Sequence, residues 1–95
     1  MDKTVVMKAT DNVATCLADM RKGEEAVVKI DADTRSVTLK GDIPFGHKVA
    51  LTDIAAGGEI TKYAETIGIA SQPIAAGEHV HIHNVESVRA RGDKA

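Results

Sequence analysis

The chain has 95 residues, with twelve Lys and Arg against fourteen Asp and Glu and a formal net charge of −2. This length predicts one small domain, and because its positive charges form no block, a nucleic-acid partner is not expected. Phe45 and Tyr63 are the aromatic residues, so the core has to be built from aliphatic side chains. Such side chains are expected to line a shallow surface rather than a deep pocket. By itself the chain is a poor candidate for a complete enzyme.

Cysteine usage and hydropathy suggest the compartment. Cys16 is the single cysteine, which excludes an intrachain disulfide and favours a reducing environment. The N-terminus lacks an apolar run of signal-peptide length, and no later segment approaches the roughly 20 apolar residues that span a bilayer. We therefore expect a cytoplasmic protein without a membrane partner.

The first element expected is a helix. Apolar residues at positions 13, 16, 17 and 20 follow helical spacing, and Thr10 or Asp11 can cap the first free amides. This pattern predicts one short N-terminal helix over residues 11–20, with Cys16 on its buried stripe. Gly23 ends the pattern.

The chain then reads as strands and turns. Residues 26–30 and 36–40 flank the turn-favouring residues 31–34, which predicts a hairpin. Further short strands are expected at residues 47–52, 59–63, 66–70 and 79–85.

A five-residue phrase recurs between these strands, with an apolar second residue and a final glycine. Its four copies are residues 19–23, 42–46, 53–57 and 73–77. The final glycine fits a turn that needs a positive φ, so each copy is expected to lead into a new strand. The spacing of 23, 11 and 20 residues between these glycines is irregular, which argues against a solenoid and for a compact fold of bent hairpins.

Histidines are concentrated in the last expected strand. Alternation places His79, His81 and His83 on one face, and Val80 and Ile82 on the other face, toward a core. Imidazoles titrate near neutral pH and ligate transition metals. Two positions apart, they can share one ion or divide into a ligand and an acid/base. His81 and His83 are the expected catalytic and metal-ligating pair, and His79, beside the turn, is the weakest member.

Simpler explanations stay open for these residues. The histidine row is also consistent with a solvated edge strand that has no function. His47 is as well explained by a buried structural histidine as by a site residue, and Lys48 and Lys62 are on priors more often solvated than functional. Asn84 is more often a turn-closing residue than a ligand.

Residues 42–85 resemble the SAF domain of the altronate and galactarate dehydratases. The resemblance is carried by Gly-His-Lys at 46–48 and by His-x-His-x-His-Asn at 79–84, with further matches in the phrases at 53–57 and 73–77. It extends to Asp-Asn-Val-Ala at 11–14 and so covers roughly residues 10–86. We expect an SAF-like domain over residues 1–86 and a polar, frayed tail over residues 87–95.

The resemblance implies a mostly β fold, a β-clip of bent hairpins. In this family the domain is either part of a long dehydratase or a separate small subunit, as in (2R)-sulfolactate sulfo-lyase. For a chain of 95 residues it implies a separate large catalytic subunit as partner, a small hydroxy-acid substrate, and a divalent metal such as iron. The implied function is that of a small subunit of a metal-dependent lyase, either a sugar-acid dehydratase or a sulfo-lyase.

Elimination next to a carboxylate needs a cation for the carboxylate, a base and an acid. Lys48, Lys62 and His47 are the expected substrate-binding residues.

Two positions depart from the family pattern: Ala64 stands where a glycine is expected, and Ile69 where an arginine is expected. Two alternatives to the lyase-subunit function are a non-catalytic module that binds a small acid and a purely structural docking module.

Overall fold

The computed structural model describes residues 4–5, 11–30, 33–62 and 65–87. Across these residues every regular element is a strand, so the expectation of a mostly β fold is confirmed. The strands are β1 Thr4–Val5, β2 Val13–Cys16, β3 Glu25–Ile30, β4 Asp33–Thr38, β5 Lys48–Ala50, β6 Glu59–Lys62, β7 Glu65–Ala70, β8 His79–Val80 and β9 Val85–Glu86. A helix long and apolar enough to cross a membrane is not found among the described residues.

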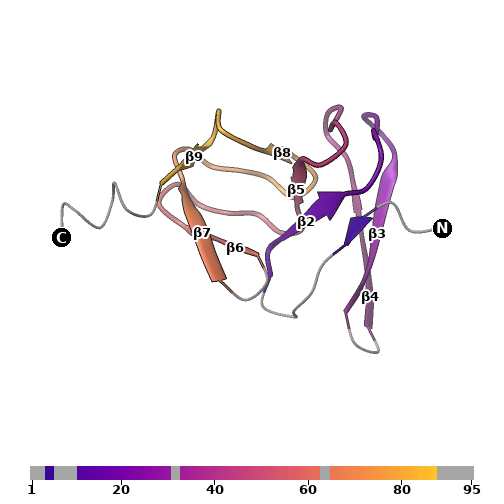
Figure 1. Ribbon diagram of the computed structural model, residues 1–95, viewed down its shortest axis with the longest axis horizontal. Coiled ribbons are helices and arrows are strands. Elements are labelled where there is room, and N and C mark those ends of the chain that lie inside the picture. Colours follow the sequence, from indigo (N-terminus) through magenta and orange to yellow (C-terminus); the bar gives the residue numbers. More distant parts are fainter. Residues whose placement is uncertain (1–3, 6–10, 31–32, 63–64, 88–95) are drawn as a thin grey trace.

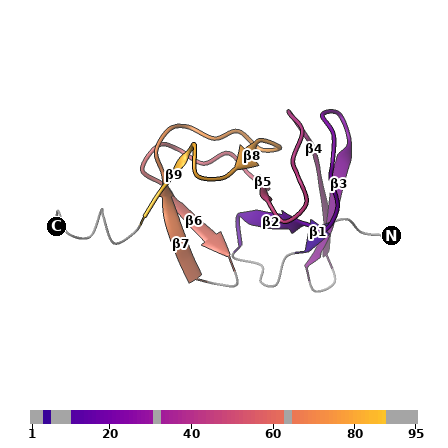
Figure 2. The same cartoon turned by 45° about the horizontal axis from the view of Figure 1, so that its top comes forward.

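The strands pair antiparallel in three groups. One sheet has the order β1-β2-β5-β8, a second is the β3–β4 hairpin, and a third has the order β6-β7-β9. The hairpin lies at one end of the molecule and β6, β7 and β9 lie at the other, with β2, β5 and β8 between them (Figure 1). The turned view in Figure 2 shows the same order along the long axis. The β2–β5 pair is therefore the centre of the fold.

Two apolar cores lie against this central pair. Successive residues of a strand face opposite ways, so Val13 and Ala14 of β2 enter different cores, as do Ala50 and Val49 of β5. The first core contains Ala14, Cys16, Met20, Ala26, Val28, Leu39, Ile43 and Val49. The second contains Val13, Ala50, Ile54, Ile60, Ala70, Ile74 and Val80.

The predicted helix over residues 11–20 is wrong. Val13–Cys16 form strand β2, which pairs with β1 on one side and β5 on the other. A strand covered on both faces has apolar side chains at successive positions, and over a short run this pattern cannot be distinguished from a helical one. The burial of Cys16 is confirmed, because its exposed fraction is 0%.

The predicted hairpin is confirmed. β3 and β4 pair in continuous register from Glu25 opposite Thr38 to Ile30 opposite Asp33. β4 begins earlier than expected, since Asp33 and Thr34 belong to the strand rather than to the turn. Residues 31–32 of the expected turn lie outside the described residues.

The turn phrases behave as predicted. Their final glycines have φ of 91°, 85°, 85° and 90° at Gly23, Gly46, Gly57 and Gly77. Two features exclude a side chain at Gly77. Its φ is positive, and a Cβ atom would overlap the backbone carbonyl of Thr38. The carbonyl of Gly77 accepts a 2.9 Å hydrogen bond from the amide of Lys40. This glycine therefore joins the fourth phrase to the segment that follows β4.

The phrases also pair with one another. Met20 pairs with Ile43, and Ile54 with Ile74, each through two backbone hydrogen bonds of 2.7–2.9 Å. All four of these second residues are buried. The leading aspartates accept hydrogen bonds from backbone amides of the paired phrase: Asp19 from Phe45, Asp42 from Lys22, and Asp53 from Ala76.

The predicted strand over residues 79–85 is wrong in its second half. β8 ends at Val80, a turn occupies residues 81–84, and β9 begins at Val85. Val80 is buried as expected, but Ile82 lies on the turn with 84% of its side chain exposed. Because alternation stops at Val80, the three histidines of this segment do not form one row on a strand face.

Three further expectations concern Ala64, Ile69 and the C-terminal tail. Ala64 and the tail from residue 88 onward lie outside the described residues. Ile69 is described: it is buried in β7 opposite Glu86 of β9. The position where the family pattern has an arginine is thus used for packing in this chain.

Candidate functional site

The second and fourth turn phrases bring three histidines together. His47 follows Gly46 and precedes β5, while His79 begins β8 two residues after Gly77. β5 and β8 pair antiparallel with Lys48 opposite Val80. The same register continued by one residue places His47 opposite His81, and cross-strand neighbours on one face lie close enough for their side chains to touch.

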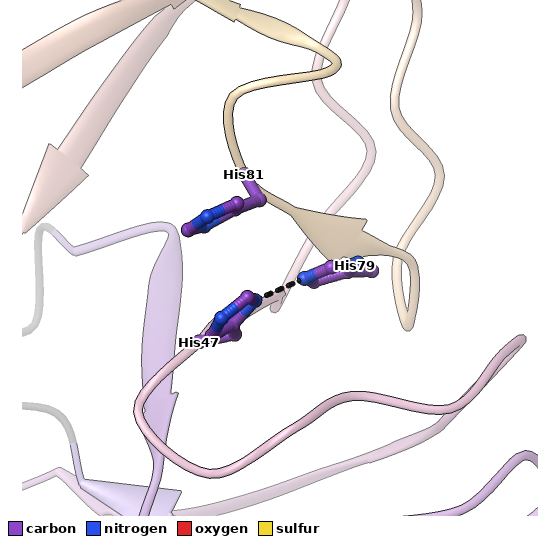
Figure 3. Close-up of side chains that lie close together, drawn as sticks. All are labelled: His47, His79 and His81. Atoms are coloured by element: carbon purple, nitrogen blue, oxygen red, sulfur yellow. Dashed lines mark hydrogen bonds between the residues drawn. The ribbon is translucent and has the colours of Figure 1, made fainter.

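His47, His79 and His81 form a compact group, which we call the histidine cluster (Figure 3). The rings of His47 and His81 are stacked, with centroids 3.9 Å apart and planes inclined by 15°. The centroids of His47 and His79 are 5.0 Å apart. One ring nitrogen from each residue can be chosen so that all three lie within 4.8 Å of one another.

Two of these rings share a hydrogen bond. Nδ1 of His47 lies 2.8 Å from Nε2 of His79, so one nitrogen carries the proton and the other presents its lone pair. The bond joins residues 32 positions apart in the chain. It holds the two imidazoles with these nitrogens facing one another.

The environment favours neutral imidazoles. Burial lowers the pKa of His79, and nearby His47, His83, His81 and Lys48 lower it further. Burial also lowers the pKa of His81, and its interactions with His47, Lys48 and His83 lower it further. Since the ordinary value is near 6.5, a lowered pKa favours the neutral form of both rings at neutral pH. A neutral imidazole can ligate a metal ion or accept a proton.

A cleft of about 180 Å³ borders the histidine cluster. Lys48 and His81 line it, together with Ile67, Ile82, Val85, Glu86 and Ser87. Burial lowers the pKa of Lys48, and Lys62 lowers it further. The cleft thus combines an apolar wall with an amine, an imidazole and the carboxylate of Glu86. The amine and the imidazole are groups that can bind and act on a small carboxylic acid.

The remaining predicted site residues lie around this group. His83 is exposed on the turn, outside the histidine cluster, with its ring centroid 5.1 Å from that of His79. Lys62 is half-buried at the end of β6, within electrostatic range of Lys48. Of the expected residues, the structure therefore gathers His47, His79 and His81, and it leaves His83 at the edge.

Buried Asn84 fixes the backbone of His79 and His81. Its Nδ2 donates a 2.8 Å hydrogen bond to the carbonyl of His79, and its Oδ1 accepts a 3.0 Å bond from the amide of His81. Its own amide donates to the carbonyl of His81 at 3.1 Å. The expectation that Asn84 closes a turn is confirmed.

A comparison of the phrases could have singled out His47 from the sequence. In the first and fourth phrases the residue after the glycine is Glu24 or Glu78, whose carboxylate accepts a hydrogen bond from the amide of the phrase's third residue. In the second phrase the third residue is Pro44, which has no amide hydrogen. A glutamate after Gly46 would therefore have no amide hydrogen to accept, and the residue at that position is His47.

Residues 2–88 match the family model of the altronate/galactarate dehydratase SAF domain. The chain belongs to this family. Altronate dehydratase of Escherichia coli (strain K12) is 47% identical over 83 residues, which are 87% of this chain and 16% of that enzyme. Altronate dehydratase of Bacillus subtilis (strain 168) is 40% identical over 87 residues, 92% of this chain and 17% of the enzyme. This SAF domain spans about one sixth of the dehydratases it matches.

A second kind of relative is similar in size to the SAF domain itself. The (2R)-sulfolactate sulfo-lyase subunit alpha of Paracoccus pantotrophus is 44% identical over 63 residues, which are 66% of this chain and 94% of that subunit. SAF domains similar to this one thus occur both as a small segment of a larger protein and as a subunit.

Proposed function

We propose that this SAF domain is the small subunit of a metal-dependent hydroxy-acid lyase whose active site is completed by a separate large subunit. The substrate is a sugar acid, as for the dehydratase relatives, or sulfolactate, as for the sulfo-lyase relatives. The observation that carries the proposal is the histidine cluster beside a cleft that also contains Lys48. Family membership supports the reaction class, and the size of the alpha-subunit relatives supports the two-subunit arrangement.

The chemistry requires charge stabilisation and proton transfer. Removing a proton next to a carboxylate builds negative charge on that carboxylate, and the leaving group on the neighbouring carbon needs a proton. Lys48 lines the cleft and in this proposal pairs with the carboxylate. Lys62, which lies near enough to lower the pKa of Lys48, and His47, which stacks on His81, are the further proposed substrate-binding residues. His81 lines the same cleft, and its imidazole can either take up and return a proton or hold the metal ion.

The metal belongs to this proposal as well. A divalent ion, iron in the first instance, would stabilise the developing negative charge as a Lewis acid when bound. Imidazole is a suitable donor for iron and zinc, and the nitrogens of the histidine cluster are close enough to fit around one ion. His83 was expected from the sequence to pair with His81 as ligand or acid/base, and its ring lies beside that of His79, with centroids 5.1 Å apart.

The proposal also includes a β-clip fold and a cytoplasmic location. The paired turn phrases and bent hairpins support a β-clip over residues 1–86. The single buried cysteine supports a cytoplasmic location.

The first experiment is capture of the partner. The chain, carrying a tag without histidines, is used to isolate its complex from native extract, and the complex is assayed on altronate, galactarate and sulfolactate with and without chelator. We expect a large partner, elimination from one of these acids, and loss of activity with chelator. A chain with no partner and no turnover would instead indicate a free-standing module that binds small acids.

The second experiment tests the histidines in that complex. Loss of an acid/base group typically lowers kcat by about 10²- to 10⁴-fold. We expect His81→Ala to lower kcat by at least about 10²-fold, whether the ring moves a proton or holds the ion, while the complex still assembles. His83→Ala is made in parallel, because the sequence pattern and the geometry rank this residue differently. If neither variant changes kcat, the domain is a structural docking module and the proposed function is wrong.

A further inference from the structure

We propose that His47, His79 and His81 bind one divalent transition-metal ion, with Nδ1 of His47 and Nε2 of His79 as two of the ligand atoms. The inference rests on the proposed function for what the ion does in catalysis, but its binding is argued from the geometry of this chain alone. It differs from the pattern expected from the sequence, in which His81 and His83 are the ligands.

The distances suit one ion. Nitrogens bound at about 2.1 Å lie about 3.0 Å apart when they meet at a right angle and about 3.4 Å apart in a tetrahedron. Nδ1 of His47 and Nε2 of His79 are already 2.8 Å apart. The largest separation in the group is within 4.8 Å, so binding requires one ring to move by roughly 1.5 Å, which a rotation of its side chain supplies.

The protonation state also suits an ion. A histidine ligand has to be neutral, and the hydrogen bond between Nδ1 of His47 and Nε2 of His79 requires one of these two nitrogens to be without a proton in either tautomer. When an ion replaces the shared proton, the proton of each ring occupies its other nitrogen. The two nitrogens that share the hydrogen bond, Nδ1 of His47 and Nε2 of His79, are therefore the two that would bind the ion.

The backbone holds the ligands on rigid elements. His47 is fixed between the turn at Gly46 and strand β5, and His79 belongs to β8. Asn84 holds the carbonyl of His79 and the amide of His81 with one buried side chain. This support fixes the backbone from which the ligands project before the ion arrives, so only a side-chain rotation is left for binding, which favours it.

His83 serves as the internal control. It is exposed on the same turn, and its ring lies beside that of His79 at a 43° inclination. It does not belong to the group of three whose nitrogens converge. An assignment based on the alternation of residues 79, 81 and 83 would make His83 a ligand, whereas the three-dimensional structure replaces it with His47.

The test measures metal binding directly, without substrate or partner. The untagged 95-residue chain is titrated with Co²⁺, followed by visible absorption, and with Zn²⁺, followed by calorimetry. We expect one ion per chain. Because even the outer partners of a ligand contribute about 10- to 100-fold to affinity, His47→Ala, His79→Ala and His81→Ala should each weaken binding by at least about 100-fold, and His83→Ala by less than about threefold.

Ring ¹⁵N NMR with Zn²⁺ identifies the ligand atoms. We expect the bound form to carry protons on Nε2 of His47 and Nδ1 of His79. Each variant is checked for folding by circular dichroism, and a variant that does not fold is replaced by the corresponding glutamine substitution.

Three outcomes would overturn the proposal: no binding to the folded chain at millimolar metal, binding that depends on His83 but not on His47, or more than one ion per chain at equal affinity. Failure here would leave the lyase proposal standing if the isolated complex still turns over substrate. Conversely, a bound ion in a chain whose complex has no lyase activity would support the site and contradict the proposed function.

Discussion

At the scale of single residues, burial controls the chemistry of Cys16. The side chain is 0% exposed at the end of β2, and burial, with a smaller contribution from Glu24, raises the pKa of its thiol to about 11. The thiolate is the reactive form of cysteine. Cys16 is therefore expected to be an inert packing residue at neutral pH, and the cysteine contributes nothing to the candidate site.

This pKa predicts how stability depends on pH. Because the folded state keeps the thiol proton after the unfolded state has lost it, the stabilising contribution is complete below about pH 9 and falls as pH rises toward 11. The urea midpoint of the native chain should decrease across this range more steeply than that of Cys16→Ala. The difference between the two chains isolates the thiol from the lysines, which titrate in both.

Alkylation provides the matching check. At pH 9 iodoacetamide should modify Cys16 readily in urea and slowly in the folded chain. Equal rates in the two states would contradict the burial of the thiol.

At the scale of elements, a four-residue turn decides where the histidines point. The turn at residues 81–84 interrupts what would otherwise be one strand, exposes Ile82, and returns the chain into β9. Buried Asn84 makes two side-chain hydrogen bonds that close this turn. The segment between β8 and β9 is thus held by one amide group, and its loss leaves a carbonyl and an amide without their partner.

Asn84→Ala is predicted to lower the free energy of unfolding by about 1 to 3 kcal/mol, the cost of leaving buried polar groups unsatisfied. Urea denaturation measures the loss, and amide hydrogen exchange at residues 79–84 should become faster. Asn12→Ala is the matched control. It removes a similar pair of hydrogen bonds, to the carbonyl of Glu59 and from the amide of Thr61, and should leave exchange at residues 79–84 unchanged. The same acceleration in both variants would show that Asn84 does not hold the turn.

At the scale of the whole molecule, two cores share one pair of strands. Val13 and Ala50 face the second core, and Ala14 and Val49 face the first. Neither core can lose its packing without exposing a face of β2 and β5. The described part of the domain is therefore expected to unfold as one cooperative unit, as small domains usually do.

Single methyl deletions in the two cores test this coupling. Ile43→Val in the first core and Ile60→Val in the second remove one buried methylene each, and each should cost about 0.5 to 1.5 kcal/mol. Both variants should keep a single urea transition with an unchanged slope. Ile82→Val, at a side chain that is 84% exposed, is the control and should change stability by less than about 0.5 kcal/mol. Two separate transitions in either core variant would show that the cores are independent.

Part of the candidate site could be predicted from the sequence. The positive φ at the phrase glycines and the turn-closing role of Asn84 follow from local chemistry. The concentration of histidines near residue 80 also indicated the region in which the structure brings His79 and His81 together with His47. The prediction failed where a short pattern had two solutions: residues 13–16 fit both a helix and a strand buried on two faces, and residues 79–85 fit both one strand and a strand followed by a turn.

The sequence by itself determined the turns, the mostly β character and the family, because each depends on residues close together in the chain or on a match along it. The tertiary structure alone decided that Val13–Cys16 is a strand, because its burial on both faces comes from two cores assembled from distant segments. It also decided that His47 meets His79 and His81. Their meeting depends on the register of β5 against β8, and pairing between segments 32 residues apart is not encoded by any local pattern.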